Sequence, residues 1–366
     1  MTLRALQTLE RHFWLGSWLR DRIARRREHA SGPRHLLFAL TDHWEPGWGD
    51  ASRSVGDARV QAWADGYPAL AAEFRDADGK PPRHSFFFPG EQYVPEWMDS
   101  LAKFTRRGLG EVELHLHHDG DSSAGVRRDI DAYVKTIGQH GHFSRDADGR
   151  PRFAFIHGNW CLSNARRDGK WCGVDDEVSL LFDAGCYADF TFPSAPDESQ
   201  PRIVNSIYWP VGDLSRRRAY ERGVRARVGE IMHDRILMIQ GPLALGPHEN
   251  RRVGLESGNL QASNPPSARR IRTWVEQEIT IQGRPEWVFV KVYTHGAPEA
   301  QARAMLGEGV RAMHRELTTR YNDGKRWVLH YVTAREMYNV AMAALAGKSG
   351  DPGQYRDHVL RPPPAA

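Results

Sequence analysis

The chain has 366 residues, which at about 100–200 residues per domain allows one large domain or two ordinary ones. Charged residues make up 26% and hydrophobic residues 40%, so a disordered chain, a collagen and a coiled coil are excluded. The net charge is only +4, and its basic residues are too scattered to indicate a nucleic-acid-binding surface. Histidine and tryptophan are frequent, with 17 and 12 residues, and their positions carry the functional prediction below.

Residues 1–33 predict an added amphipathic helix. Its apolar side chains recur at roughly helical spacing, with arginines between them. They are Leu3, Leu6, Leu9, Phe13, Leu15, Trp18, Leu19 and Ile23. We favour a helix packed on the rest of the domain over one that lies on a membrane surface. The segment lacks the apolar core and cleavage site of a signal peptide, and the chain has no run of 18 apolar residues, so we expect a cytoplasmic protein without a transmembrane segment.

The three cysteines, Cys161, Cys172 and Cys186, form no CxxC pair. Their odd number in a long chain argues against a disulfide framework, and the missing pair argues against a cysteine-based zinc site. We expect three separate reduced thiols.

Short apolar runs then alternate with helical patterns along the chain. The runs are rich in Phe, Val, Ile and Leu, as buried strands are. They cover residues 35–42, 84–89, 111–118, 152–158, 186–192, 235–241, 286–296 and 326–333. The helical patterns cover 57–76, 95–106, 124–138, 174–184, 267–279, 298–320 and 334–346. The last of these follows Thr333, with Glu336 three residues on, which predicts a capping box.

This repetition predicts parallel strands in an α/β fold. A deformed (β/α) barrel of seven or eight units over residues 34–346 fits the count, and a doubly wound sheet is the alternative. Residues 192–266 hold clusters of Pro, Ser, Gly and Asn, and we expect them to form an elaborated insertion. Residues 347–366 end in RPPPAA and are expected to form a flexible tail.

Polar residues gather where the predicted strands end. In a (β/α) barrel the chemistry lies at these C-terminal ends, so the repeated pattern favours a shared site over coincidence. The residues are Asp42, His43, Trp44 and Glu45; His115, His117, His118 and Asp121; His157, Asn159 and Trp160; Asp189; and His295.

The third strand carries the densest group. Strand alternation places His115 and His117 on one face, with Glu113 beneath them as a buried structural group. His117, His118 and Asp121 lie at the turn that leaves this strand. Two imidazoles and a carboxylate suit a zinc-like ion with one open position. The alternative is a network of hydrogen-bonded histidines without a metal.

The order of these motifs resembles that of the polysaccharide deacetylases of the NodB-homology type, carbohydrate esterase family 4, within the glycoside hydrolase and deacetylase barrel superfamily. In ALTDHWEP (39–46), Asp42 resembles the catalytic base, and His43 stands where the metal-binding acid would be. In HLHHDGD (115–121), His117 and Asp121 have the spacing of the two metal-binding histidines. His295 resembles the strand-end histidine that acts as general acid, and YVTAREM (331–337) is similar to the passage that often closes such domains.

The resemblance implies a metal-dependent hydrolase that removes an N-acetyl group from a sugar or polysaccharide. A divalent ion, expected to be zinc, would sit on some of His43, His117, His118 and Asp121. Asp42 would then act as general base and His295 as general acid. The partner would be an N-acetylated carbohydrate.

Further residues near the strand ends are candidates for substrate binding, because aromatic faces suit sugar rings and polar groups suit sugar hydroxyls. They are Trp44, Glu45, His115, His157, Asn159, Trp160 and Asp189.

Three alternatives remain open from the sequence. A glycoside hydrolase on the same barrel needs two carboxylates on either side of the bond, and Asp42, Glu45, Asp121 and Asp189 are candidates. A non-catalytic carbohydrate-binding relative needs no metal. A metal-dependent phosphoesterase fits the ligand types, although no Gly-rich phosphate loop is present.

Overall fold

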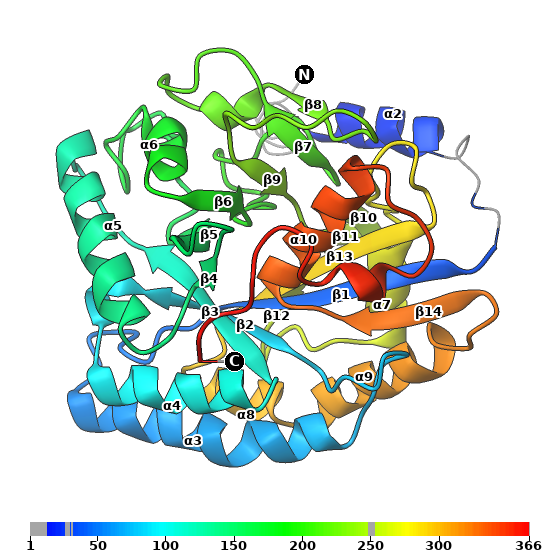
Figure 1. Cartoon of the computed structure of the whole chain (residues 1–366), viewed down its shortest axis with the longest axis horizontal. Coiled ribbons are helices and arrows are strands. Elements are labelled where there is room, and N and C mark those ends of the chain that lie inside the picture. The colour runs from blue at the N-terminus through cyan, green and yellow to red at the C-terminus, as the bar shows by residue number, and fades with distance from the viewer. Residues whose placement is uncertain (1–12, 26–29, 31, 248–252, 366) are drawn as a thin grey trace.

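The computed structural model describes residues 13–25, 30, 32–247 and 253–365 (Figure 1). It is a mixed α/β structure around a large, mostly parallel sheet, as the alternation of strand and helix patterns predicts. The first twelve residues, which we expected to belong to the N-terminal helix, lie outside the described residues.

All eight predicted strands are present. They are β1 (Arg34–His43), β2 (His84–Pro89), β3 (Gly110–Leu116), β5 (Pro151–His157), β6 (Cys186–Asp189), β9 (Leu237–Ile239), β13 (Trp287–Thr294) and β14 (Trp327–Tyr331). Six short strands add to them: β4 (Ser144–Arg145), β7 (Ile207–Pro210), β8 (Gly223–Arg225), β10 (Ala244–Pro247), β11 (Val253–Glu256) and β12 (Asn259–Leu260). Of these six, all but β4 lie in the stretch 192–266, which has no long helix among its described residues.

The main sheet runs in the order β12-β13-β1-β2-β3-β5-β6-β9-β7-β8. The central strand β1 pairs with β13 along one edge. Its other edge is divided, because residues 34–38 pair with β14 and residues 40–43 pair with β2. Within the part of the chain that the structure describes, this hydrogen-bonded path does not return to its start. The sheet is therefore open, and the closed barrel that we expected is not seen.

The predicted helices are also present, with one division. They are α2 (Leu15–Arg25), α3 (Arg53–Ala72), α4 (Pro95–Arg106), α5 (Ser123–Gly138), α6 (Glu177–Asp183), α7 (Ala268–Val275), α8 (Glu299–Met305), α9 (Glu308–Arg320) and α10 (Ala334–Leu345). The helix predicted over 298–320 is interrupted at Gly307, a poor helix former that caps α9. The capping box of Thr333 and Glu336 at the start of α10 is confirmed.

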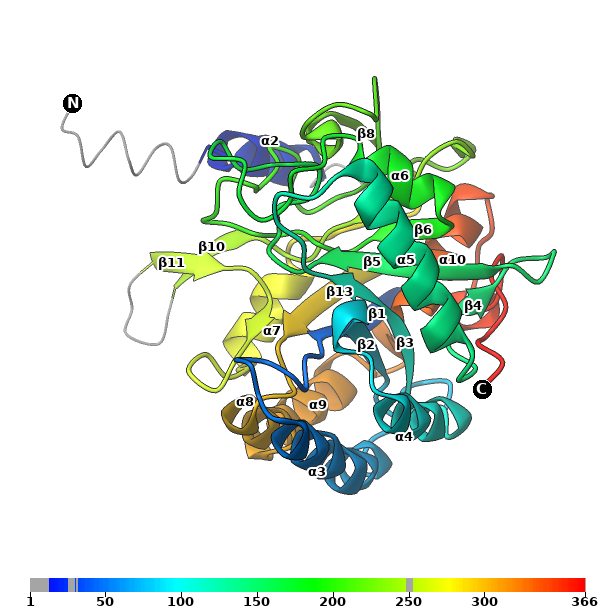
Figure 2. The same ribbon diagram turned by 90° about the vertical axis from the view of Figure 1, so that its left-hand side faces the viewer.

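The two faces of the sheet have different coverings. Leu36, Phe38 and Leu40 of β1 point to a core shared with α3, α4 and α5, and we call this side the outer face. Leu37 and Ala39 point to a second core that contains α10, and we call this side the inner face. Figures 1 and 2 show α3 and α4 together along one side, while α10 lies against the opposite side of the strands. Every residue of α10 is buried.

Both ends of the described chain pack on the domain. Trp14 is fully buried beside Val204 and Leu243, and Nε1 of Trp18 donates to Gln277 at 2.9 Å. This agrees with a packed N-terminal helix. In the described residues, no helix has both the length and the apolar character needed to span a lipid bilayer.

The segment after α10, expected to be a flexible tail, is instead held in place. The side-chain amide of Asn339 donates to the carbonyl oxygens of Arg356 and Leu360. The Arg356 guanidinium in turn contacts Asp76 and Glu336. Composition suggested flexibility, but these buried polar partners fix the backbone as far as Leu360, and the amides of Arg361 and Ala365 donate to the carbonyls of Arg145 and Gly141.

Candidate metal centre at the strand ends

Histidines from neighbouring strands meet on the inner face, just past the C-terminal ends of those strands. Residues at even spacing share one face, so His43 follows Leu37 and Ala39 onto the inner face of β1. The same alternation places His115 there from β3, and Glu113 lies beneath it. The carboxyl of Glu113 accepts the hydroxyl of Tyr187, and burial raises its pKa to about 8. The predicted structural role of Glu113 fits this position.

Glu45, two residues past β1, is the centre of the group. Its Oε1 lies 3.0 Å from Nε2 of His117 and 3.5 Å from Nε2 of His115. Its Oε2 accepts a hydrogen bond from Nδ1 of His295 at 3.0 Å. The ligand atoms of Glu45, His115 and His117 all lie within 4.8 Å of one another. We call these three residues the inner cluster.

The second nitrogen of each inner-cluster histidine is committed to an acceptor. Nδ1 of His115 donates to the carbonyl of Ile156 at 3.0 Å, because a carbonyl oxygen can only accept. Nδ1 of His117 donates to the carboxylate of Glu91 at 2.6 Å. In a neutral imidazole, Nε2 is then the lone-pair nitrogen. Both Nε2 atoms therefore face the Glu45 carboxylate, and each presents a lone pair to it when its ring is neutral.

This arrangement fits a divalent cation. Oε1 of Glu45 and Nε2 of His115 are buried and have no hydrogen-bond partner among the described residues. Acceptors that face one another repel unless a proton or a cation lies between them. Two histidines and one carboxylate, with the outer nitrogens fixed by a carbonyl and a carboxylate, match a zinc site that keeps one position open.

Without a cation, the cluster has strongly perturbed charges. Burial acts to raise the pKa of Glu45, but its contacts with the three histidines outweigh burial and hold that pKa far below its ordinary value. Burial also acts to lower the pKa of His117, yet Glu45 and Glu91 raise it to about 9. Burial, followed by the neighbouring rings of His295 and His115, lowers the pKa of His43 well below its ordinary value.

One side of the inner cluster reaches solvent. The side chain of His117 is 27% exposed and that of His295 is 18% exposed. Two tryptophan rings border His295, with centroid separations of 5.7 Å for Trp48 and 6.4 Å for Trp160. The Trp160 ring also lies 6.3 Å from His43. These two tryptophan rings, which we call the aromatic wall, therefore lie next to the exposed edge of the inner cluster.

Asp42 points to the opposite face of the sheet. It is fully buried, its Oδ2 lies 2.8 Å from Nε2 of His84, and its Oδ1 accepts the backbone N–H of Gly296 at 2.6 Å. A Cβ at Gly296 would come within 2.2 Å of the same carboxylate, so only glycine fits this approach. Asp42 thus fixes the backbone beside His295, and its two oxygens do not face the inner cluster.

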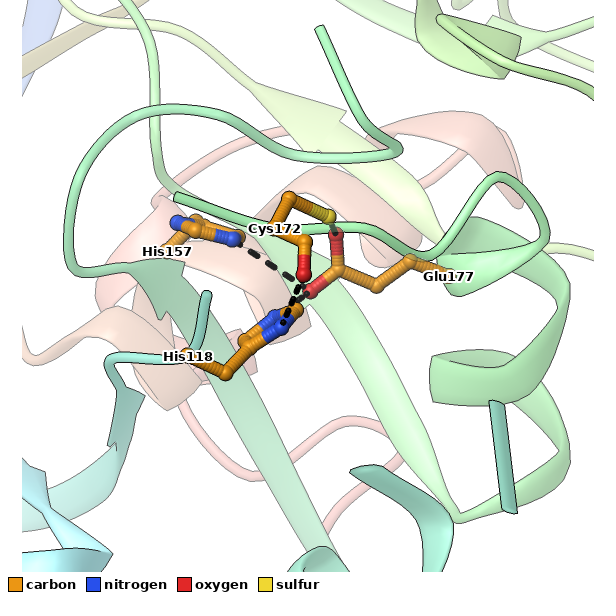
Figure 3. A group of neighbouring side chains, drawn as sticks. All are labelled: His118, His157, Cys172 and Glu177. Atoms are coloured by element: carbon orange, nitrogen blue, oxygen red, sulfur yellow. Dashed lines mark hydrogen bonds and ion pairs between the residues drawn. The ribbon is translucent and has the colours of Figure 1, made fainter. Parts of the chain in front are cut away.

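A second group lies on the outer-face side, between the ends of β3 and β5 and the start of α6 (Figure 3). It consists of His118, His157, Cys172 and Glu177, whose ligand atoms also lie within 4.8 Å of one another. We call these four residues the outer cluster. His117 and His118 are consecutive in the chain, yet they belong to different clusters because successive side chains of an extended segment point to opposite sides.

The four predicted metal ligands therefore do not come together. His117 is in the inner cluster and His118 in the outer one, while His43 packs its ring 4.7 Å from that of His115. Oδ1 of Asp121 instead accepts the backbone N–H of Ser122, at the start of α5.

The predicted substrate-binding residues also separate. Glu45, His115 and Trp160 lie at the inner cluster, and His157 lies in the outer one. Trp44 is fully buried against Phe86 and Phe88. The backbone amide of Asn159 donates to His157, and the buried carboxyl of Asp189 accepts from Thr191.

Sequence reasoning missed Glu91, Cys172 and Glu177. Glu91 follows β2 in a short 3-10 turn, Gly90–Gln92, and its position directly after a buried strand was an available signal. Cys172 and Glu177 come from the loop and helix after β5, and no periodic pattern marks them. The three cysteines are free, as expected, and all three are buried.

We found no match between this chain and any known protein-family model, and no curated protein sequence matches it. The function has to be inferred from the geometry of the site.

Proposed function

We propose that this protein is a metal-dependent hydrolase that removes an acyl group, in particular an N-acetyl group, from a carbohydrate. The observation that carries the proposal is the inner cluster, in which the Nε2 atoms of two histidines and one carboxylate oxygen converge within 4.8 Å of one another. We propose further that the open sheet is a deformed relative of the deacetylase-type barrel. The parallel order of β1, β2, β3 and β5 and the site at their C-terminal ends support this.

The inner cluster supplies three ligands for a divalent ion, expected to be zinc. Such an ion polarises a carbonyl oxygen and makes water more acidic, which is the chemistry that amide hydrolysis requires. Glu91 and the carbonyl of Ile156 hold the two imidazoles so that their Nε2 atoms point at Glu45. These outer hydrogen bonds fix both the ring orientation and the tautomer.

His295 is the proposed proton carrier. Its Nδ1 proton is held by Oε2 of Glu45, which leaves Nε2 free to accept a proton and later to deliver it to the departing amine. Glu45 therefore has two roles, one for each oxygen. Asp42 is assigned a positioning role in place of the base role that the resemblance implied, because it holds the amide of Gly296 next to His295.

The aromatic wall supports a sugar as the substrate. Trp48 is 49% exposed, and its ring stands beside His295. The ring of Trp160 lies beside both His295 and His43, with centroid separations of 6.4 Å and 6.3 Å. Flat indole faces bury the apolar face of a sugar ring while its hydroxyls stay in water.

The paired-carboxylate alternative of a glycosidase has less support. Asp42 and Asp189 are both buried, and each bonds to its own neighbours in the fold. Of the candidate carboxylates, Glu45 alone belongs to the histidine group, where a metal ligand is the simpler role.

The test combines acetate release with metal content. Purified full-length protein, loaded with zinc, is assayed on oligomers of N-acetylglucosamine before and after treatment with a chelator. We expect acetate release that a chelator abolishes and added zinc restores. The Glu45→Gln variant should lose this activity together with the inner-cluster metal.

The matched control is Asp99→Asn. It removes a carboxylate that lies 2.7 Å from another histidine, His140, outside both clusters. This variant should keep both activity and metal. Failure of the zinc-loaded protein to release acetate, or release that survives both the chelator and Glu45→Gln, contradicts the proposal.

A further inference from the structure

The outer cluster unites residues from four separate segments (Figure 3). His118 follows β3, His157 ends β5, Cys172 lies in the long loop between β5 and α6, and Glu177 begins α6. Figure 3 shows the four side chains pointing toward one another, with the Glu177 carboxylate in the middle. The group lies apart from the reaction proposed for the inner cluster and does not depend on it.

The outer cluster is closed to solvent. His157, Cys172 and Glu177 are fully buried, and His118 is 9% exposed. Two imidazoles, a thiol and a carboxyl make a complete four-donor set for tetrahedral zinc, and closed four-ligand sites are the structural kind. The inner cluster, with three donors and an exposed edge, has instead the form of a catalytic zinc site, which keeps one position open.

Two backbone N–H groups are directed at the Cys172 sulfur. Its Sγ accepts two backbone N–H groups, from Asn164 at 3.2 Å and from Val174 at 3.4 Å. The sulfur also lies 3.4 Å from Oε2 of Glu177. Without a cation the thiol keeps its proton and donates it to Glu177. A bound cation would take the place of that proton, and the two backbone N–H groups directed at the sulfur would then stabilise its negative charge.

The histidines present nitrogens to the same point. Nδ1 of His118 donates to the carbonyl of Cys172 at 3.2 Å, so its Nε2, 2.9 Å from Oε1 of Glu177, is the lone-pair atom of the neutral ring. Nε2 of His157 is buried without a hydrogen-bond partner among the described residues, 3.7 Å from the same oxygen. Metal binding there moves the His157 proton to Nδ1 and ends its contact with the amide of Asn159. One neutral hydrogen bond is a small loss beside structural zinc binding.

The loop that carries Cys172 has a backbone that its surroundings must hold in place. Residues 158–176 contain no helix or strand, and four of their non-glycine residues have positive φ: Trp160, Ser163, Asn164 and Trp171. That backbone conformation is unfavourable for residues with a side chain and persists only where the surroundings enforce it.

We infer that His118, His157, Cys172 and Glu177 form a second metal site, which binds one zinc ion and fixes the 158–176 loop against the ends of β3 and β5. The loop includes Trp160, so this ion also holds one wall of the inner cluster in place.

The first test uses cobalt, because a thiolate bound to Co²⁺ gives a charge-transfer absorption that nitrogen and oxygen ligands do not give. Metal-free full-length protein is titrated with Co²⁺. We expect two equivalents to bind and the thiolate band to appear. Cys172→Ser should lose the band and one equivalent of metal, whereas Glu45→Gln should lose one equivalent and keep the band.

Cys161→Ser is the matched control, because Cys161 is an equally buried free thiol in the same loop. It should retain the band. Absence of the band from the wild-type protein, or its survival in Cys172→Ser, overturns the inference. These outcomes are independent of acetate release, so the inner-cluster proposal stands or fails separately.

A measurement on the wild-type protein alone covers the case in which Cys172→Ser does not fold. X-ray absorption of the zinc-loaded chain should show a sulfur neighbour at about 2.3 Å from zinc. A spectrum explained by nitrogen and oxygen neighbours alone would overturn the inference, because the inner cluster contributes no sulfur.

Discussion

The inner and outer clusters each contain one of two consecutive histidines, His117 and His118, which point to opposite sides of the sheet. His117 faces the side of α10, together with two other donors and an edge open to water, whereas His118 faces a closed group of four donors. An open three-donor site leaves room for a substrate, and a closed four-donor site does not. We therefore propose a catalytic role for one cluster and a structural role for the other, although the same residue types occur in both.

The largest expected effect concerns the function of the inner cluster. Glu45→Gln keeps the size of the side chain but removes its charge, so both the ion and the His295 proton lose their partner. We expect kcat/KM for acetate release to fall by about 10³-fold or more, since an ion of this kind contributes several kcal/mol to the transition state. The free energy of unfolding should change little by comparison. Steady-state kinetics and urea denaturation of the same preparation check both halves.

For Glu177→Gln we expect the reverse, a large loss in the free energy of unfolding and a smaller loss of acetate release. It neutralises a fully buried carboxylate that contacts His118, the amide of Ser163 and the Cys172 thiol. Loss of one partner from a buried charged group costs about 3–5 kcal/mol of stability. The measurement is the urea midpoint against wild type. If Glu177→Gln were as stable as Glu45→Gln, the assignment of a structural role to the outer cluster would be wrong.

His142, a buried histidine outside both clusters, makes the free energy of unfolding sensitive to acid independently of the clusters. Nε2 of His142 donates to the carbonyl of Met98, and burial lowers its pKa from 6.5 to about 4. The unfolded chain takes up a proton at a higher pH than the folded chain does. Stability is therefore complete above pH 6.5 and falls as the pH drops toward 4, by up to about 3 kcal/mol.

His142→Gln removes this titration and can keep the donor to Met98. Its free energy of unfolding should fall less steeply over that range of pH than that of the wild type, with chelator present in both samples. If the free energy of unfolding of the variant and of the wild type fell equally steeply with pH, groups other than His142 would dominate the acid response. An acid effect on the clusters would then have to be compared with a variant of one of those groups.

The smallest effect is expected at Glu91, which touches the inner cluster from outside. Glu91→Gln weakens the hold on Nδ1 of His117 without removing a ligand. Changes to such partners typically cost about 10–100-fold in metal affinity or activity. Zinc competition titrations should show that loss at the inner cluster, with the cobalt–thiolate band of the outer cluster unchanged. A loss as large as that of Glu45→Gln would make Glu91 a direct ligand.

Local patterns predicted the elements well, for a physical reason. Strands such as β1 and β13 are buried on both faces and are therefore continuous apolar runs, and α10 begins at a capping box visible in the sequence. Closure of the sheet was not predictable in this way. It depends on whether the strands at the two ends of the hydrogen-bonded path, β12 and β8, pair with each other, which is a matter of long-range register.

The site was predicted in part. Alternation along β3 correctly put His115 and His117 on one face, because that rule is local. The central position of Glu45 was not visible, since its partners lie about 70 and 250 residues away along the chain. Likewise, the contact between His118 and Glu177 depends on how α6 packs beside β5. The resemblance to a family motif suggested Asp121, and not Glu177, as the carboxylate near His118.

The central claim is that a metal ion lies between Oε1 of Glu45 and the Nε2 atoms of His115 and His117. A crystal structure of the zinc-loaded protein, with anomalous scattering recorded on both sides of the zinc edge, tests it most directly. We predict an anomalous peak within bonding distance of these three atoms, about 2.0–2.2 Å for nitrogen and oxygen ligands. Absence of a peak there, with the two imidazoles bonded to protons or water alone, would contradict the account.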